Sequence, residues 1–427
     1  MLSDLLNLFI ILFFVFYGIK RPVVALCGVL WVDVYKPQST SYSFLNGLPL
    51  SMIMSLFFFM VFFLSIKKIK VPKSPVYHFF VISFMVWITI TSVYSQFPTI
   101  AWMKHDIAFK TILFAYFIPF VLVDKKAIET FLWIIIPSFG AFVFMAGTKT
   151  FMGGGGYGIA LAGDGGFMWA EGSTLATQAV SLLPIFWYSM KNTELVLRYP
   201  YMKYILWGYS FCALLTLIGT QARTGIVCIA VLLFLIVMKT KQKVKNLLLL
   251  SIIPLIILPF AGSDYFERMD TISSSEAAAN DASAQGRVVV WRWTLDYVAE
   301  KPFMGGGFYA YRANAGQLDA YSDSNEVTIS TPHPKAFHSI IFEVLGGHGY
   351  VGLFLFLGII THLLFINNSP KKQNPESRGD KTNWQFTLAK TINVSILVYC
   401  AGGLFIGVAF YPWLYYMYGL KVALTAE

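Results

Sequence analysis

The sequence predicts an all-α polytopic membrane protein with about 12 transmembrane helices. Of its 427 residues, 57% are hydrophobic and only 13% are charged, whereas soluble domains carry roughly 25% charged residues. Apolar stretches close to the roughly 20 residues that cross a bilayer recur along the whole chain. Lysine and arginine gather in alternate loops between these stretches, which is the charge bias of cytoplasmic loops.

Each apolar stretch is expected to form one helix. The predicted spans cover residues 4–19, 22–35, 47–66, 76–95, 107–123, 129–146, 174–190, 203–220, 224–238, 246–262, 337–366 and 388–410. The first is expected to be a retained span, because no basic segment precedes it and no small-residue cleavage site follows it. The second is short, which predicts a tilted or partly re-entrant helix. The aromatic tail from Tyr411 to Tyr418 is expected in the membrane interface.

One set of alternate loops is basic throughout, and we assign it to the cytoplasm. Its members are Lys20 and Arg21; Lys67, Lys68, Lys70 and Lys73; Lys125 and Lys126; Lys191, Arg198 and Lys203; Lys239, Lys241, Lys243 and Lys245; and Lys371, Lys372, Arg378 and Lys381. The opposite face then carries the loops at 36–46, 96–106, 147–173 and 263–336, with a short turn at 221–223.

The long loop divides the chain. Residues 1–262 are predicted to hold ten spans, residues 263–336 a periplasmic loop subdomain, and residues 337–427 two more spans and a tail. Within the loop, residues 286–298 predict an amphipathic helix on the membrane surface, ended by Pro302 and the glycines that follow.

Composition excludes several classes of function. The net charge is +10, but the basic residues lie beside apolar spans, so membrane topology explains them and no nucleic-acid partner is expected. The four cysteines lie in apolar segments without CxxC spacing and are interpreted as small buried hydrophobic residues, so no disulfide framework or zinc site is implied. No HExxH, GxSxG or carboxylate-rich motif is present, so no metal or cofactor is expected. The glycine run at 153–158 has no following Lys-Ser/Thr, and we interpret it as a flexible loop.

Two arginines are candidates for anion binding. Arg223 lies in the short turn between two apolar runs, where a guanidinium costs on the order of 2.5–3.5 kcal/mol even on a lenient scale. It either snorkels to the membrane surface or clamps an anion, because its planar donors match phosphate oxygens. Arg287 is expected at the N-terminus of the loop helix, where backbone N–H groups would add to an anion site. The alternative for Arg287 is a solvated surface position. Arg292, five residues further, shares that face only loosely.

His338 lies at the non-cytoplasmic mouth of a predicted span. Its imidazole would be neutral near pH 7 and able to accept a proton, although a satisfied interfacial histidine is the alternative. Glu343 follows in the same helix and needs a partner if it is buried, either an imidazole or an arginine. The glycines from Gly346 to Gly352 predict close helix packing or a helix break.

The order of these residues resembles the O-antigen ligase and polymerase superfamily, which are polytopic inner-membrane glycosyltransferases of the GT-C type. The residues that carry the resemblance are Arg223, Gly286, Arg287, Trp291, Pro302, Gly305, His338, Ser339, Glu343 and Gly347. The resemblance is most specific from about residue 200 to 360. Near the N-terminus, Lys20-Arg21-Pro22 and Pro37 resemble a subgroup of O-glycosylation ligases.

The resemblance implies roles for particular residues. In this family, arginines contact the pyrophosphate of an undecaprenyl-linked glycan and a histidine acts near the attacking hydroxyl. It therefore implies Arg223 and Arg287 for pyrophosphate and His338 for catalysis. The family often has asparagine after this histidine, and Ser339 here leaves the orientation of the imidazole open. Further candidates, by proximity in sequence or as possible partners, are Arg292, Arg312, Lys335, His333 and Glu343.

The expected function is that of an O-antigen ligase in the bacterial inner membrane with a periplasmic active site. It would transfer an undecaprenyl-pyrophosphate-linked glycan to a sugar hydroxyl of lipid A-core, with inversion and without a metal. An O-antigen polymerase, a protein O-oligosaccharyltransferase and a lipid-linked glycan transporter are the alternatives. The candidates cluster at one face, which favours an enzyme, because a transporter would spread titratable residues through the spans. The sequence does not distinguish the acceptors, the sugars or the oligomeric state.

Overall fold

The computed structural model describes residues 2–153, 171–239, 260, 282–321, 333–366 and 383–425. These residues form fifteen α-helices and three short 3₁₀ helices, without a strand. Five of the helices are long and apolar enough to cross a membrane, and four shorter helices are also apolar. The prediction of an all-helical polytopic membrane protein is therefore confirmed.

The helix bounds agree closely with the predicted spans. They are α1 Leu2–Gly18, α2 Pro22–Tyr35, α3 Pro37–Thr40, α4 Leu50–Leu64, η1 Ile66–Lys68, α5 Pro75–Val93, α6 Pro98–Val121, α7 Lys125–Phe151, α8 Gly172–Asn192, α9 Glu194–Arg198, α10 Met202–Gly219, α11 Arg223–Lys239, α15 Ala282–Glu300, η3 Ala310–Asn314, η4 Leu318–Tyr321, α16 Ile340–Phe365, α17 Asn383–Gly403 and α18 Pro412–Ala423. Every predicted span except 246–262 coincides with a helix. That span lies outside the described residues, as do the glycine run from 154 and the basic loops at 240–245 and 371–381.

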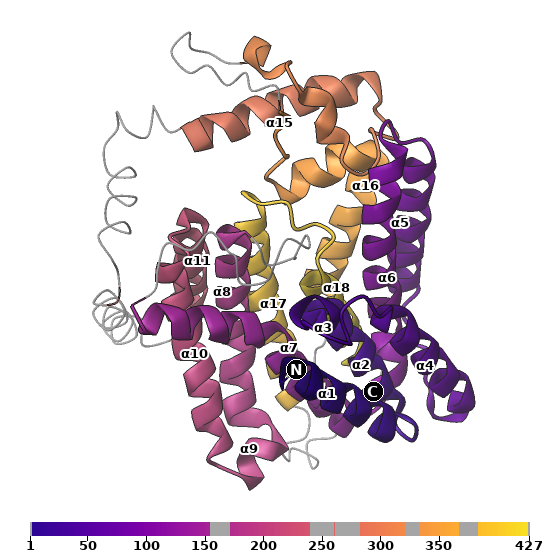
Figure 1. The fold of residues 1–427 in the computed structure, drawn as a ribbon, viewed down its shortest axis with the longest axis vertical. Coiled ribbons are helices and arrows are strands. Elements are labelled where there is room, and N and C mark those ends of the chain that lie inside the picture. The colour runs from indigo at the N-terminus through magenta and orange to yellow at the C-terminus, as the bar shows by residue number, and fades with distance from the viewer. Residues whose placement is uncertain are drawn as a thin grey trace.

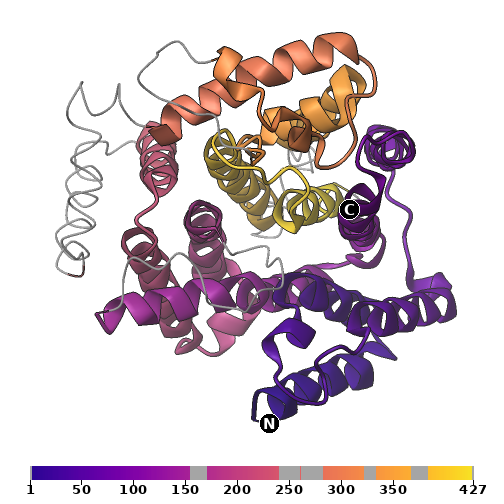
Figure 2. The same cartoon turned by 45° about the horizontal axis from the view of Figure 1, so that its top comes forward.

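The helices form a bundle with the long loop at one end. Helix α7 packs against α2, α8 and α10, while α17 packs against α8 and α11. Helix α16 packs against α5, and α18 against α6. The loop helix α15 lies across one end, next to α16, and α9 lies at the opposite end (Figure 1). Figure 2 shows α15 spanning that end from the side of α11 to the side of α5.

The C-terminal helix α18 corrects one expectation. The tail from Tyr411 to Tyr418 was predicted to lie in the membrane interface, but all of α18 is buried inside the protein. Its aromatic hydroxyls find internal partners: Tyr416 donates to the Asp33 carboxylate at 2.6 Å, and Tyr415 donates to the Ala409 carbonyl at 2.7 Å. Because these hydroxyls are satisfied within the protein, the rings do not need to reach the membrane surface.

Glycines join the long loop to α16 through backbone contacts. The N–H groups of Gly306 and Gly307 donate to the carbonyls of Gly346 and Gly347 at 3.0 and 2.7 Å. Helix α16 is kinked at Gly349, where φ is +66°, a conformation that favours glycine. The predicted close packing and helix break are both present. These backbone contacts place the residues after α15 directly against the first turns of α16.

The same loop is tied to the turn between α5 and α6. The Ser95 hydroxyl and the Gln96 N–H both donate to the Gly306 carbonyl, at 3.1 and 3.3 Å. The Tyr297 hydroxyl of α15 donates to the Gln96 side chain at 3.0 Å. Segments that are far apart in sequence are therefore held together at this end of the bundle.

Candidate active site

A pocket with about 680 Å³ of empty space, partly open to solvent, lies at the loop end of the bundle. We call it the His338 pocket, and it is lined by Lys104, Glu171, Gly307, Phe308, Tyr309, Tyr311, Ala336, Phe337, His338, Glu343 and Gly407. These residues come from α6, the residue before α8, the loop after α15, the start of α16 and the connection between α17 and α18. The loops at 96–106, 147–173 and 263–336, which were predicted to share a face, thus meet at one pocket.

His338 has an unusual backbone conformation that its neighbours support. Its φ is +46°, in the left-handed region that non-glycine residues rarely adopt. The Trp291 indole N–H donates to the carbonyl of the preceding residue, Phe337, at 2.8 Å, and the indole stacks on Phe342 with ring centroids 5.2 Å apart. The Ser339 hydroxyl accepts a hydrogen bond from the first turn of α16. Ser339 therefore acts as the N-cap of α16.

A buried asparagine holds the segment that leads to His338. The Asn314 side chain donates to the Lys335 carbonyl at 2.8 Å and accepts from the Lys335 N–H at 3.0 Å. Asn314 is fully buried, so these two bonds satisfy an amide that would otherwise be costly to bury. The backbone on the N-terminal side of His338 is fixed by this pair.

Glu171 is the charge partner of His338, and the sequence reasoning missed it. Its Oε1 lies 3.9 Å from His338 Nδ1, and the residue immediately precedes α8. Burial lowers the pKa of His338, the positive charges of Arg287 and Lys335 lower it further, and Glu171 opposes them. A neutral imidazole near pH 7 follows. The available signal was a single carboxylate just before a predicted span, on the face that the loop charges predict to be periplasmic.

Arg287 and Arg223 are not among the residues that line the pocket, although the charge of Arg287 acts on His338. Burial lowers the pKa of the Arg287 guanidinium, Glu171 raises it, and the charge of Arg223 lowers it. The two arginines and Glu171 are therefore close enough to interact electrostatically. The turn before Arg223 packs closely on the start of α8. The approach is so close that a Cβ added to Gly172 would lie 3.2 Å from the Thr220 carbonyl oxygen.

One expectation about Arg287 is wrong. Helix α15 begins at Ala282, so Arg287 lies beyond the first turn and not at the helix N-terminus. The unpaired N–H groups of a helix belong to its first four residues. They therefore do not add to an anion site at Arg287, whose contribution is that of its own half-buried guanidinium.

The other sequence candidates have different surroundings. Arg292 and His333 are exposed, and the exposed Arg312 guanidinium lies 5.9 Å from the centre of the Tyr309 ring, at the edge of the pocket. The Lys335 ammonium reaches toward α15, where it lies 3.6 Å from the position of a Cβ on Gly286. Of these four, Lys335 is the one whose charge acts on His338.

Glu343 lines the pocket but has a different partner from those expected. Its Oε2 accepts a hydrogen bond of 2.9 Å from the Ala409 N–H, and this backbone contact replaces the predicted imidazole or arginine. Across the pocket, the Lys104 ammonium lies 5.4 Å from the centre of the Tyr411 ring. The sequence analysis had assigned Lys104 no role and placed it in the loop 96–106, whereas it lies in α6. In the described part of the chain, no group of three or more metal-ligating side chains is present.

Comparison with known families supports the reading of residues 200–360. Residues 208–357 match the family model described as O-Antigen ligase. Residues 2–194 match a model described as a family of unknown function (DUF5935). No curated protein sequence matches the chain significantly. The first match contains Arg223, Arg287 and His338, and the second contains Lys104 and Glu171.

Proposed function

Because residues 208–357 match the family model described as O-Antigen ligase, we propose that the protein is an O-antigen ligase with its active site in the His338 pocket. The donor is an undecaprenyl-pyrophosphate-linked glycan, and the acceptor is a sugar hydroxyl of lipid A-core. The pocket faces the periplasm of a bacterial inner membrane. The observation that carries the proposal is a half-exposed imidazole beside the Glu171 carboxylate, with the cations Arg287 and Lys335 within electrostatic reach.

His338 acts as the general base. Its Nδ1 side is directed to Glu171, which leaves Nε2 for the acceptor hydroxyl. As the hydroxyl oxygen bonds to the anomeric carbon, the proton passes to His338 and the bond between that carbon and the pyrophosphate oxygen breaks. A positioned base contributes about 10²–10⁴-fold. The carboxylate of Glu171 stabilises the imidazolium that forms.

The arginines act on the leaving group. Arg223 and Arg287 face negative charge that grows on the departing pyrophosphate, and fixed cations are most effective against charge that develops in the transition state. Their mutual repulsion in the absence of substrate is relieved by an anion between them. A single direct displacement inverts the anomeric carbon. Lys104 adds a cation at the α6 wall of the pocket.

The test is transfer by the purified protein in detergent or nanodiscs. Lipid-linked glycan is incubated with lipid A-core, with further lipid-linked glycan, or with a serine- and threonine-containing peptide, and the products are separated. Product with lipid A-core supports the ligase. Product only with further donor or only with peptide would replace it by the polymerase or the protein transferase.

A matched histidine pair tests the base. His338→Ala is expected to lose at least 100-fold in turnover, whereas His333→Ala, an exposed histidine five residues earlier in the same segment, is expected to keep it. Both variants are compared for folding by thermal unfolding. Equal turnover of the two variants would remove His338 from the mechanism.

A further inference from the structure

A second pocket lies far from His338 and gathers residues from three basic loops. It has about 690 Å³ of empty space, partly open to solvent, and four cations line it: Lys20 and Arg21 before α2, Lys68 in η1, and Lys126 at the start of α7. We call it the basic pocket. Its residues belong to the loops that the charge pattern assigns to the cytoplasm. A lipid ligand would therefore come from the cytoplasmic leaflet of the membrane.

The charge of the basic pocket is largely uncompensated. Among the described residues that line it, Asp124 is the one carboxylate, so four cations and one anion leave a formal charge of 4 − 1 = +3. Asp124 is itself engaged as the N-cap of α7, because its Oδ1 accepts from the Ala127 N–H at 2.7 Å. The pocket therefore carries a surplus of positive charge that attracts an anion.

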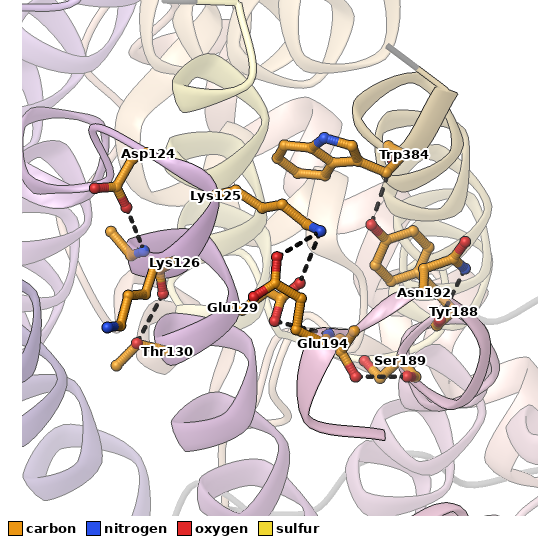
Figure 3. A network of polar contacts seen from close by, with 12 residues as sticks. Asp124, Lys125, Lys126, Glu129, Thr130, Tyr188, Ser189, Asn192, Glu194 and Trp384 are labelled. Atoms are coloured by element: carbon orange, nitrogen blue, oxygen red, sulfur yellow. Dashed lines mark hydrogen bonds and ion pairs between the residues drawn. The ribbon is translucent and has the colours of Figure 1, made fainter. Parts of the chain in front are cut away.

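The neighbouring cation Lys125 gives the contrast. Its ammonium lies 2.9 Å from Glu194 and 3.7 Å from Glu129, so its charge is balanced within the protein. Figure 3 shows Lys125 directed toward these two carboxylates, while Lys126 points away from them, toward the other side of α7. The two adjacent lysines thus have different surroundings, the first in an ion-pair network at the protein surface and the second in the basic pocket.

The basic pocket continues into a larger apolar groove of about 1240 Å³. Arg21, Lys126 and Thr130 line both cavities, so the two are contiguous. Beyond these shared residues the groove is lined mainly by aromatic and aliphatic side chains, Phe13, Tyr17, Val24, Trp133, Ile134, Leu195 and Tyr199, with Glu129, Glu194 and Arg198 at its polar edge. A cationic mouth that leads into an apolar groove fits a molecule with a phosphate at one end and a hydrocarbon chain at the other.

We propose that this composite site binds an anionic glycerophospholipid of the leaflet at the lysine-rich end of the bundle. The phosphate lies among Lys20, Arg21, Lys68 and Lys126, and an acyl chain runs along the groove past Tyr17 and Trp133. Basic pockets between helices on the cytoplasmic side bind anionic headgroups in this way. The site is separate from the His338 pocket, so it depends on neither the donor nor the acceptor of the transfer reaction.

Lipid binding to the purified full chain in detergent tests the proposal. Native mass spectrometry counts retained phosphatidylglycerol and phosphatidylcholine, and titration gives their affinities. Phosphatidylglycerol is expected to bind at least about tenfold more tightly, because each cation near an anionic headgroup contributes on the order of 1 kcal/mol. The double variant Lys68→Gln/Lys126→Gln is expected to lose about tenfold or more in phosphatidylglycerol affinity and to bind phosphatidylcholine as before.

The matched control removes two charges from the same surface outside the pocket. Lys67→Gln/Lys73→Gln alters exposed lysines that line neither cavity, and it is expected to retain tight phosphatidylglycerol binding. Equal loss in the two double variants would reduce the effect to general surface charge and overturn the site. Competition by millimolar inorganic phosphate that removes the lipid preference would also overturn it, because the ligand would then be a free anion.

Discussion

The indole N–H of Trp291 donates a hydrogen bond of 2.8 Å to the carbonyl of Phe337, the residue directly before His338. This bond joins the middle of α15 to the segment that holds the proposed base in a left-handed backbone conformation. The loop helix therefore supports the geometry of the His338 pocket in addition to carrying Arg287.

Trp291→Phe should weaken this support selectively. Phenylalanine can still stack on Phe342 but cannot donate to the Phe337 carbonyl. We expect a loss of about 1 kcal/mol in stability, the usual net value of one hydrogen bond, together with a clear fall in glycan transfer. Thermal unfolding and transfer assays measure the two effects.

Trp293→Phe is the control for that change. The Trp293 indole N–H donates to the Gln317 side chain at 2.8 Å, so this variant also loses one hydrogen bond from α15. Its bond does not reach the His338 segment. We expect similar destabilisation with transfer retained, and a parallel fall in transfer would mean that any disturbance of α15 has the same result.

The pH dependence of transfer should move in opposite directions in two variants. The neutral imidazole is the active form of the base, so activity is lost as the pH falls through the pKa of His338. Glu171→Gln removes a charge that raises this pKa, and the acidic limb should shift to lower pH. Lys335→Met removes a charge that lowers it, and the limb should shift to higher pH.

These shifts are read from the pH profile of kcat/KM. A purely structural role for Glu171 or Lys335 would reduce activity at every pH without displacing the limb. Unmoved limbs in both variants would therefore contradict the charge relationships around His338, and shifts of the same sign would contradict one of them.

Arginine substitutions should weaken donor binding. Arg223→Ala and Arg287→Ala each remove a cation proposed to contact the pyrophosphate, and hydrogen bonds to charged groups contribute about 1.5–3 kcal/mol. We expect on the order of tenfold to hundredfold weaker binding of the lipid-linked donor. Arg292→Ala, an exposed position on α15, serves as the control and should bind normally. Normal binding by Arg223→Ala would count against the anion clamp.

The kink of α16 should tolerate no side chain. At Gly349 the φ of +66° is strained for alanine, and an added Cβ would lie 2.2 Å from the Phe303 carbonyl oxygen. Gly349→Ala is expected to cost about 1–3 kcal/mol from strain alone, with more from the overlap. Gly208→Ala in α10 is the control, because no atom lies within 4 Å of its added Cβ. If the two variants lowered the unfolding midpoint equally, strain and overlap at Gly349 would not be the cause of the destabilisation.

The apolar helices were located accurately because apolar content is a local property that is read within each segment regardless of its neighbours. Five of the described helices are long and apolar enough to cross a membrane, and four apolar helices are shorter. The main difference is at α6, which begins at Pro98 instead of residue 107 and so includes Lys104. Charged residues in the first turns of α6 lower the hydropathy of that stretch, so the predicted span began too late in the sequence.

The proposed site was predicted only in part, for the same physical reason. Three candidates carry local signals in the sequence. Arg223 is a guanidinium that is costly to place near the membrane, Arg287 lies in a polar loop, and His338 lies at the mouth of a predicted span. Glu171 carries little local signal, because its importance depends on a distance of 3.9 Å to a residue 167 positions later in the chain, counting from 171 to 338. Pairwise contacts of this kind are set by helix packing.

The sequence alone determined the apolar segments, the alternation of their basic loops and the match of residues 208–357 to the O-antigen ligase family model, since each is written in consecutive residues. The tertiary structure alone decided that Glu171 and Lys104 share a pocket with His338 and that the aromatic tail is buried. It also decided that three basic loops meet around one cavity. These features arise from close packing between distant segments, where side-chain shape and hydrogen-bond partners select one arrangement among many with the same hydrophobic pattern.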